Sequence, residues 1–307
     1  MSAKPSVVQT HHLVEQAIEL ETPTGTIKGT LTTGGGSFKS LVVLLIAGSG
    51  PTDRDGNTVG FTGKNNHLKL LAAGLGAMGI ASVRYDKRGV SESSKAIRIE
   101  SDLRIVDYVQ DAVFWIAKLG NDPRFSSVAV IGHSEGSLIG MLAAQSSDVT
   151  AFVSIAGAAD KAANVLRRQL HGKLSPDLLR FNEKILTSLE AGRIVRDVPR
   201  EFLALYRPSV QPYLISWFKL SPTKEIAKLQ MPCLIVQGGT DIQVNIADAD
   251  ALNANSKNCS LRLIAGMNHI LKTVPNNMDG QIASYSDPTL PIDSELMHTL
   301  TEFLSIK

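Results

Sequence analysis

The sequence is poor in cysteine, with only Cys233 and Cys259 among its 307 residues. Two cysteines cannot build a disulfide framework or a cysteine zinc cluster. Free cysteine behaves as a small apolar side chain and is among the most buried residue types. We therefore expect both residues to be buried free thiols beside strands. The seven histidines show no metal-ligand spacing, so the sequence predicts neither a metal nor a cofactor.

The chain also lacks an excess of charge of one sign and any long apolar run. Its 31 basic and 29 acidic residues leave a net charge of +2, which is too small to favour nucleic acid or an anionic membrane. The longest apolar run, residues 41–47, is far short of the roughly 20 residues that a membrane helix needs. The first twelve residues lack the apolar core of a signal peptide. We expect a cytoplasmic protein, although a signal peptide removed before residue 1 would leave the same sequence.

What the sequence does have is an alternation of short strands and helical patterns over most of its length. Two strand-like runs around a Pro-Thr-Gly turn, at 13–21 and 26–32, predict an antiparallel pair. Further strand-like runs occur at 41–48, 80–86, 127–132, 150–157, 232–239 and 260–266. Helical patterns occur at 66–78, 103–119, 135–146, 245–254 and 292–305. The alternation predicts an α/β fold in which helices flank a mostly parallel central sheet.

One interval, residues 158–228, interrupts this alternation with helical segments and contains no convincing strand. We interpret it as a helical cap inserted into a core that comprises residues 1–157 and 229–307. Ligands bind at the carboxyl ends of the strands in open α/β sheets. Because the insertion follows the strand at 150–157, we expect it to lie over the site.

The interval also carries six of the chain's 16 aromatic residues. Pockets for small ligands favour aromatic walls, so we expect Tyr206, Tyr213 and Trp217 to line a substrate pocket. Packing within the core of the cap itself is the alternative for all three residues.

The segment Gly132-His133-Ser134-Glu135-Gly136 connects a buried strand to a helix of small apolar residues. A tight turn at this junction lifts the Ser134 hydroxyl above the sheet, and the two glycines remove side chains that would collide there. The following helix directs unpaired N–H groups at the same place. The spacing therefore predicts Ser134 as a nucleophile, with a connection merely rich in small residues as the alternative.

At this point the chain resembles the α/β-hydrolase superfamily over nearly its whole length. The segment GHSEGS is similar to that family's nucleophile elbow, IAGSGPTDRDG to its oxyanion loop, and YDKRGVSES to the segment after the next strand. One departure is that this chain has Ala47-Gly48 where a His-Gly pair is common. Within the superfamily, the motifs most resemble bacterial serine esterases grouped with serine-aminopeptidase-like hydrolases.

The resemblance implies that an acid and a histidine follow Ser134 in that order. Asp241, just past a strand, is the expected acid, and His269, after the last strand, is the expected base. A turn aspartate that accepts backbone N–H bonds is the alternative for Asp241, and a solvent-exposed loop histidine is the alternative for His269. Asp248 and Asp250 are weaker candidates because they fall inside a predicted helix.

The resemblance also implies an oxyanion hole made by the backbone N–H groups of Ser49 and Glu135. We expect the Glu135 side chain to complement the positive end of the helix that it begins. Three charged residues follow the oxyanion loop: Asp53, Arg54 and Asp55. We expect one of them to pair with Arg88 and hold the loop in place, and solvated surface charges are the alternative.

Together these residues predict a serine hydrolase that cleaves small-molecule carboxylic esters through an acyl-enzyme on a Ser-His-Asp triad. An aminopeptidase, thioesterase or acyltransferase of the same fold would use the same triad. A noncatalytic binding protein that keeps the fold is the alternative of a different class. The sequence does not indicate the oligomeric state or the length of the acyl group.

Overall fold

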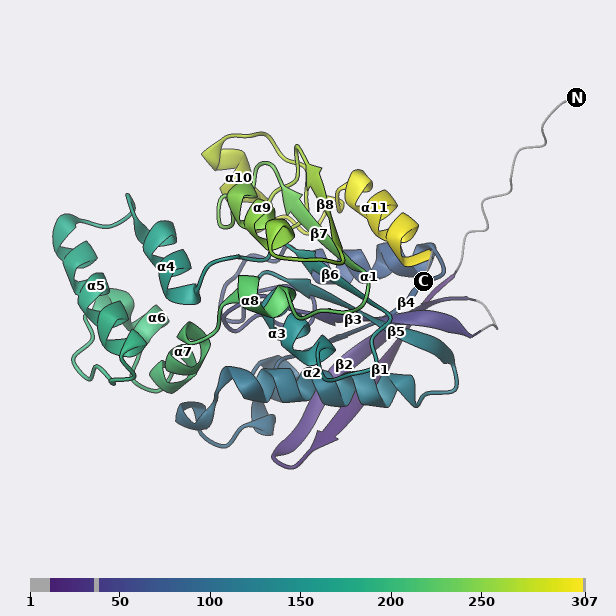
Figure 1. The fold of residues 1–307 in the computed structure, drawn as a ribbon, viewed down its shortest axis with the longest axis horizontal. Helices are drawn as coiled ribbons and strands as arrows, with labels where there is room; N and C mark the ends of the chain where they lie inside the picture. Colours follow the sequence, from purple (N-terminus) through teal and green to yellow (C-terminus); the bar gives the residue numbers. More distant parts are fainter. Residues whose placement is uncertain (1–11, 36–38, 306–307) are drawn as a thin grey trace, which may run out of the picture.

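The computed structural model describes residues 12–35 and 39–305 and contains one eight-stranded sheet (Figure 1). The strands lie in the order β1-β2-β4-β3-β5-β6-β7-β8. β1 pairs antiparallel with β2, and β2 with β4, whereas all other neighbours are parallel. The strands are β1 (Leu13–Thr22), β2 (Gly25–Gly34), β3 (Ser40–Ile46), β4 (Ala81–Tyr85), β5 (Phe125–His133), β6 (Ala151–Ile155), β7 (Cys233–Gly238) and β8 (Cys259–Ile264).

Helices cover both faces of this sheet. The α-helices are α1 (His67–Ala77), α2 (Ile105–Gly120), α3 (Glu135–Ala144), α4 (Ala162–Leu170), α5 (Pro176–Glu190), α6 (Leu203–Tyr206), α7 (Gln211–Phe218), α8 (Pro222–Ile226), α9 (Ile246–Ala254), α10 (Met278–Ser284) and α11 (Ser294–Ser305). Short 3₁₀ helices are η1 (Ser91–Ala96), η2 (Glu100–Asp102) and η3 (Arg200–Phe202). The predicted α/β architecture is confirmed.

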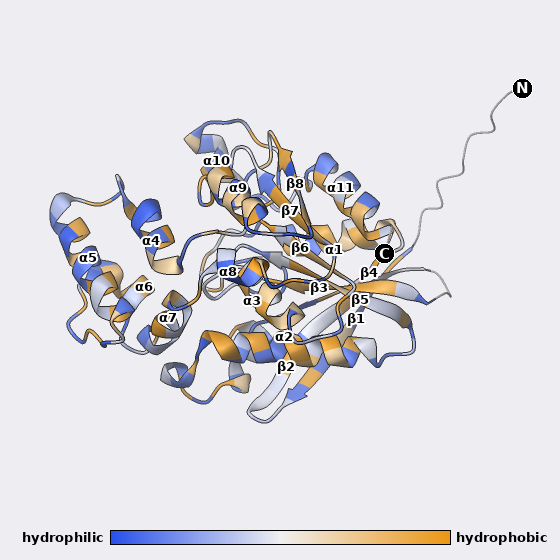
Figure 2. Cartoon of the chain, viewed as in Figure 1, coloured by the Kyte–Doolittle hydropathy of each residue, from blue (hydrophilic) through white to orange (hydrophobic). Residues whose placement is uncertain are grey.

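Two apolar cores lie on opposite faces of the sheet, because side chains alternate between the faces along each strand. Along β3, Leu44 belongs to the core with residues of α2, α3 and α9, whereas Leu45 belongs to the core with residues of α1 and α11. Figure 2 shows the apolar residues gathered in the strands and on one face of several flanking helices. No helix among the described residues is long and apolar enough to cross a membrane.

The interval 158–228, called the insertion from here on, runs between β6 and β7 and holds α4 to α8. Figure 1 shows α4 to α7 projecting beyond the sheet, whereas α8 lies beside α3. The side-chain amide of Gln145, just after α3, donates to the Glu225 carboxylate of α8 at 3.1 Å. The last short helix of the insertion therefore packs on the core.

The prediction of two free thiols is wrong. Cys233 and Cys259 form a disulfide, and they occupy paired positions at the starts of the neighbouring parallel strands β7 and β8. Each strand was predicted from its own composition, but their register brings the two sulfur atoms together. The disulfide thereby joins the two strands that lead to Asp241 and His269.

Candidate active site

Ser134 lies at a sharp turn between β5 and α3. Its backbone has φ 55°, a left-handed value that costs free energy for any residue with a side chain. A Cβ atom on Gly132 would lie 2.2 Å from the Gly136 oxygen, and a Cβ atom on Gly136 would lie 2.2 Å from the Ile46 oxygen. The flanking glycines are therefore required by close backbone approach, which is the physical basis of the Gly-x-Ser-x-Gly spacing.

Asp241 and His269 lie at the carboxyl ends of β7 and β8 and form the predicted hydrogen bond. His269 Nδ1 is 2.8 Å from Asp241 Oδ2. The other carboxylate oxygen accepts the backbone N–H groups of Gln243 and Val244, at 2.7 and 3.0 Å. Burial opposes ionisation of Asp241, but its hydrogen bonds and the neighbouring His269 hold its pKa below the ordinary value. Asp241 is thus an ionised acceptor at neutral pH and fixes one nitrogen of His269.

The two other aspartates considered for the acid position have different surroundings. Asp248 caps α9 together with Asn245 and accepts two hydrogen bonds from Arg168 of α4, at 2.9 and 2.8 Å. Asp250 is exposed on α9. Neither contacts His269 in the described part of the chain, so Asp241 is the aspartate that the fold brings to the predicted base.

The side chain of His133, the residue before Ser134, contacts the predicted base His269 at its backbone. Its Nε2 donates to the His269 carbonyl oxygen at 2.7 Å, and the two rings lie 4.9 Å apart. Burial lowers the pKa of His133 to about 3, so the ring is neutral at physiological pH. No role for His133 could be predicted from the sequence, although its place directly before Ser134 was a signal that it lies at the site.

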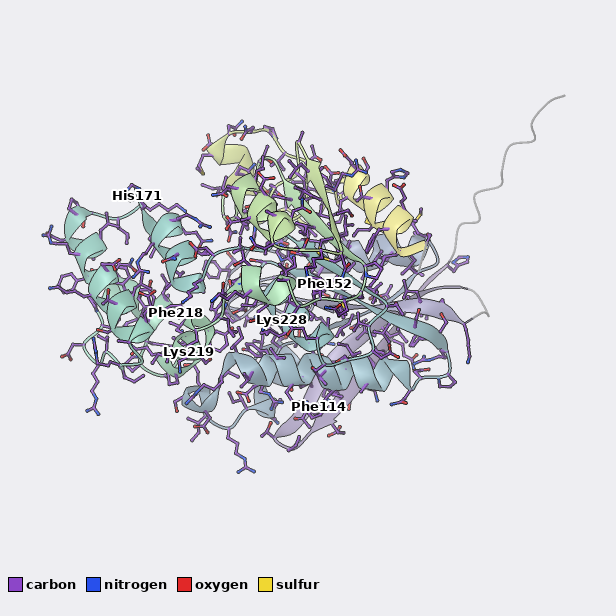
Figure 3. All side chains as sticks on the ribbon, in the orientation of Figure 1. Phe114, Phe152, His171, Phe218, Lys219 and Lys228 are labelled. Atoms are coloured by element: carbon purple, nitrogen blue, oxygen red, sulfur yellow. A yellow bond between two sulfur atoms is a disulfide. The ribbon has the colours of Figure 1, made fainter. Side chains whose placement is uncertain are left out.

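A second neutral histidine, His67, contacts the other ring nitrogen of His133. His67 Nδ1 lies 2.7 Å from the Asn65 side-chain oxygen, and His67 Nε2 lies 3.4 Å from His133 Nδ1. Burial holds the pKa of His67 well below its ordinary value. The sequence placed His67 at the start of a helix and gave no sign of this contact. Figure 3 shows His171, by contrast, at the outer end of the insertion, away from the sheet.

The predicted oxyanion loop lies directly against the nucleophile turn. A Cβ atom on Gly48 would lie 3.2 Å from Ser134 Cβ, so a side chain here would press against the nucleophile. The next residue, Ser49, has its carbonyl oxygen held by the Thr52 hydroxyl at 2.8 Å. Glu135 is the first residue of α3, and the first N–H groups of a helix have no partner within the helix. The backbone N–H groups of Ser49 and Glu135 thus belong to the two segments that border Ser134.

The expected pairing of Arg88 with the residues after this loop is wrong. Arg88 Nε donates to Asp111 of α2 at 3.0 Å. The reason is where β4 ends: Arg84 and Asp86, in the strand and directly after it, face the loop, whereas Arg88 lies three residues beyond Tyr85 and no longer follows the alternation of the strand. The loop is held by the ion pairs Arg54–Asp86, at 2.6 Å, and Asp55–Arg84, at 2.9 Å.

A cavity of about 340 Å³ lies between the insertion and the core, with Ser134 in its wall. Tyr213 and Trp217 of α7 line it, as expected from the sequence. The expectation for Tyr206 is wrong, because its side chain is fully buried within the insertion and its hydroxyl donates to Asn182 of α5 at 2.7 Å. Most of the remaining wall is apolar. No group of His, Cys, Asp and Glu side chains among the described residues could hold a metal ion.

Comparison with known proteins agrees with this architecture. Residues 58–206 match the family model described as serine aminopeptidase, S33; that stretch includes Ser134 and ends before Asp241. Esterase EstD from Thermotoga maritima is 28% identical over 247 residues, which is 80% of this chain and 57% of EstD. The chain thus spans little more than half the length of this curated relative.

Two solved structures share the fold. Est1E from Butyrivibrio proteoclasticus has a TM-score of 0.61 at 17% identity, covering 95% of this chain and 99% of Est1E. The α/β hydrolase GrgF from Penicillium sp. sh18 has a TM-score of 0.62 at 17% identity, with the same two coverages. With the sheet order, the nucleophile turn and these matches together, the chain has the α/β-hydrolase fold.

Proposed function

We propose that this protein is a serine hydrolase that cleaves small-molecule carboxylic esters through an acyl-enzyme. Ser134 is the nucleophile, His269 the base, and Asp241 the acid that orients the base. The observation that carries the proposal is the strained Ser134 turn in the wall of an apolar cavity, with the Asp241–His269 pair hydrogen-bonded at the ends of the adjoining strands. The name of EstD, an esterase, supports the same activity.

The steps follow from these positions. His269 takes the proton of the Ser134 hydroxyl as its oxygen attacks the ester carbonyl, and Asp241 stabilises the imidazolium that forms. The negative carbonyl oxygen is held by the backbone N–H groups of Ser49 and Glu135. Proton return from His269 releases the alcohol, and a water molecule activated by the same imidazole then releases the acid from Ser134.

The charges around the cavity favour an ester over the N-terminus of a peptide. An aminopeptidase has to bind the substrate's α-ammonium group, for which an unpaired carboxylate is the natural partner. Of the lining carboxylates, Glu135 is paired with Lys87, at 3.0 Å, and Glu100 with Arg207. The third, Asp160, accepts a backbone N–H and the amide of Asn164. An uncharged acyl group suits this wall better than an aminoacyl group.

We also propose that the insertion is a cap that limits the size of the acyl group. Its helices α4 and α7 contribute Leu166, Leu214 and Trp217 to the wall of the cavity that Ser134 also lines. An apolar wall of this kind binds an acyl chain through burial of its methylene groups, each contributing about 0.8 kcal/mol.

The test is hydrolysis of p-nitrophenyl esters of rising chain length beside aminoacyl-anilides, with wild type and Ser134→Ala compared. The proposal requires ester turnover and fluorophosphonate labelling in the wild type, and loss of both in Ser134→Ala. Ester turnover that persists at the wild-type rate in purified Ser134→Ala would refute Ser134 as nucleophile. Faster cleavage of the anilides than of any ester would refute the substrate class.

A further inference from the structure

A buried ion pair lies beside the nucleophile and takes no part in the steps described above. Lys87, after β4, and Glu135, at the start of α3, have their charged atoms 3.0 Å apart, and each side chain is only 1% exposed. Removing two charges from water carries a large desolvation cost, and such pairs often contribute little net stability. The pair therefore calls for an explanation other than stability.

The second hydrogen bond of Lys87 supplies that explanation. Lys87 Nζ donates to the Gly48 carbonyl oxygen at 2.6 Å. This oxygen belongs to the same peptide group as the Ser49 N–H, and in a trans peptide the C=O and N–H point to opposite sides. Holding the oxygen toward Lys87 therefore points the Ser49 N–H in the opposite direction, away from Lys87. A cation on the oxygen also polarises the amide, which strengthens its N–H as a donor.

Glu135 connects this lysine to the other proposed donor. Its backbone N–H is the second proposed oxyanion donor, while its side chain accepts from Lys87. One residue thus supplies one donor and, through Lys87, anchors the peptide that supplies the other. The Tyr108 ring lies 5.0 Å from Lys87 Nζ and covers the ammonium on a further side.

The insertion contacts this cluster through the phenol of a tyrosine on α7. Tyr213 of α7 donates its hydroxyl to the second oxygen of Glu135, and its ring packs 5.6 Å from that of Tyr108. Burial and then the charge of Glu135 hold the pKa of Tyr213 well above its ordinary value, so the hydroxyl remains a donor. Tyr213 also lines the cavity. Its hydrogen bond therefore connects α7, which borders the substrate site, to Glu135.

We infer that Lys87 is a positioning residue, whose ammonium sets the Gly48–Ser49 peptide as an oxyanion donor, and that Glu135 and Tyr213 couple this peptide to the insertion. The inference rests on the proposed ester hydrolysis. It predicts that disturbing the cluster weakens binding of the transition state more than binding of the ester.

The experiment measures kcat and KM for p-nitrophenyl butyrate and the inhibition constant of a trifluoromethyl ketone with the same acyl chain. The ketone adds to Ser134 and places an oxyanion where the transition state has one. Lys87→Met is expected to lower kcat about 100-fold, the size found for loss of one oxyanion donor. Tyr213→Phe is expected to lower kcat about fivefold with KM changed by less than a factor of about two. In both variants the ketone's affinity falls in parallel with kcat/KM.

Two further variants protect the test against misfolding and nonspecific effects. Lys87→Met/Glu135→Gln removes both charges, so that no buried charge is left unpaired, and is expected to match the kcat of Lys87→Met. Tyr206→Phe deletes the other buried phenol hydroxyl of the insertion, which donates to Asn182, and is expected to behave as wild type.

The outcomes separate this inference from the proposed function. A wild type without ester turnover, or turnover independent of Ser134, overturns the proposed function. With Ser134-dependent turnover in hand, wild-type kcat and ketone affinity in the double variant overturn the role of Lys87. Wild-type values in Tyr213→Phe overturn the coupling to the insertion, and so does a rise in KM at unchanged kcat, because that is loss of substrate binding alone.

Discussion

The core and the insertion place their charged groups in opposite ways. In the core, the side chains of Lys87, Glu135 and Asp241 are buried, and each makes at least two hydrogen bonds of defined geometry. In the insertion, Arg167 joins α4 to Glu183 and Glu190 of α5 with side chains that are about a third to a half exposed. Ion pairs in water contribute little stability, whereas buried charges require every partner. The difference indicates a core that tolerates little change around its chemistry and an insertion whose sequence can vary with its substrate.

The largest expected effect comes from breaking the core at Asp241. Asp241→Asn keeps the size of the side chain but removes the charge that stabilises the His269 imidazolium and fixes its tautomer. We expect kcat to fall about 10⁴-fold. The measurement is kcat for p-nitrophenyl butyrate, with Asp250→Asn, exposed on α9, as the matched control. A loss smaller than about tenfold would contradict the proposed role of Asp241, since a merely structural aspartate is expected to act through stability.

The next largest effect is expected from removing the disulfide, which also belongs to the core. Replacing Cys233 and Cys259 together by alanine frees a loop of 26 residues and is expected to lower the free energy of unfolding by about 3 kcal/mol. Urea unfolding of the variant beside the oxidised wild type measures this. Because the cysteines lie at the starts of β7 and β8, far along each strand from the ends that lead to Asp241 and His269, kcat at 25 °C is expected to be unchanged. Equal stability of variant and wild type would contradict the prediction.

The predicted strands and the nucleophile turn could be read from the sequence because their signals are local. A run of apolar residues such as 41–47 identifies β3 by itself, and the spacing of glycines around Ser134 records a clash between neighbouring backbone atoms. The disulfide could not be predicted because it depends on the register between β7 and β8. Arg88 was assigned the wrong partner for a similar reason, since its partner depends on the path of the chain after β4 ends at Tyr85.

For the candidate site, the sequence predicted those residues that can be recognised from their order along the chain. That order identified Asp241 and His269 but could not show Lys87 on the Gly48 carbonyl, a contact between segments 39 residues apart. In the insertion, helical patterns gave α4 and α5, but not the direction in which a side chain of the single-turn helix α6 points. Tyr206 and Tyr213 are both buried tyrosines, and only the packing of α6 against α5 decides that Tyr206 faces Asn182.

Acid is expected to affect the core through its buried histidines. The folded protein holds the pKa values of His67 and His133 below their ordinary value, whereas the unfolded chain binds protons at about 6.5. For His133 the stability contributed is therefore complete above about pH 6.5 and is lost as pH falls toward 3. The contribution of His67 is lost in the same direction, and each histidine that stays neutral in the folded protein adds a slope of about 1.4 kcal/mol per pH unit to the free energy of unfolding below pH 6.5.

Comparing a histidine variant with wild type isolates this effect, because the carboxylates titrate in both proteins. One of these carboxylates is Asp111, and its burial raises its pKa to about 6. Urea unfolding of His67→Gln from pH 6 to 4 should show a slope smaller than wild type by about 1.4 kcal/mol per pH unit. His298→Gln, which alters an exposed residue of α11, is the control and should keep the wild-type slope. The same slope in His67→Gln and wild type would mean that His67 is not held neutral in the folded protein.

Within the insertion, Trp217 is expected to change selectivity while leaving the chemistry intact. Trp217→Ala enlarges the cavity wall on α7, so esters with longer acyl chains gain relative to butyrate by about tenfold in kcat/KM, the value of one to two methylene contacts. Hydrolysis of p-nitrophenyl acetate should persist near the wild-type rate. Phe181→Ala, on the exposed side of α5, is the control. An unchanged chain-length profile in Trp217→Ala would refute its place in the acyl site.

The smallest expected effect tests the boundary between the two regions. Arg168 of α4 donates to Asp248 of α9, whose side chain is only 3% exposed, whereas Arg168 itself is 41% exposed. Because the guanidinium stays largely in water, Arg168→Gln is expected to lower the free energy of unfolding by about 1 kcal/mol. Arg167→Gln, which breaks ion pairs wholly within the insertion, is expected to lower it by less than about 0.5 kcal/mol.

Salt sharpens this last comparison. Exposed pairs are screened at high ionic strength, while a partner that is buried is screened less. Urea unfolding in low salt and in 1 M sodium chloride, a concentration at which the screening length is about 3 Å, should therefore abolish the effect of Arg167→Gln and leave part of that of Arg168→Gln. If the two variants respond identically to salt, Asp248 does not anchor the insertion more firmly than the insertion's own surface pairs do, and the contrast between the two regions fails at the place where they meet.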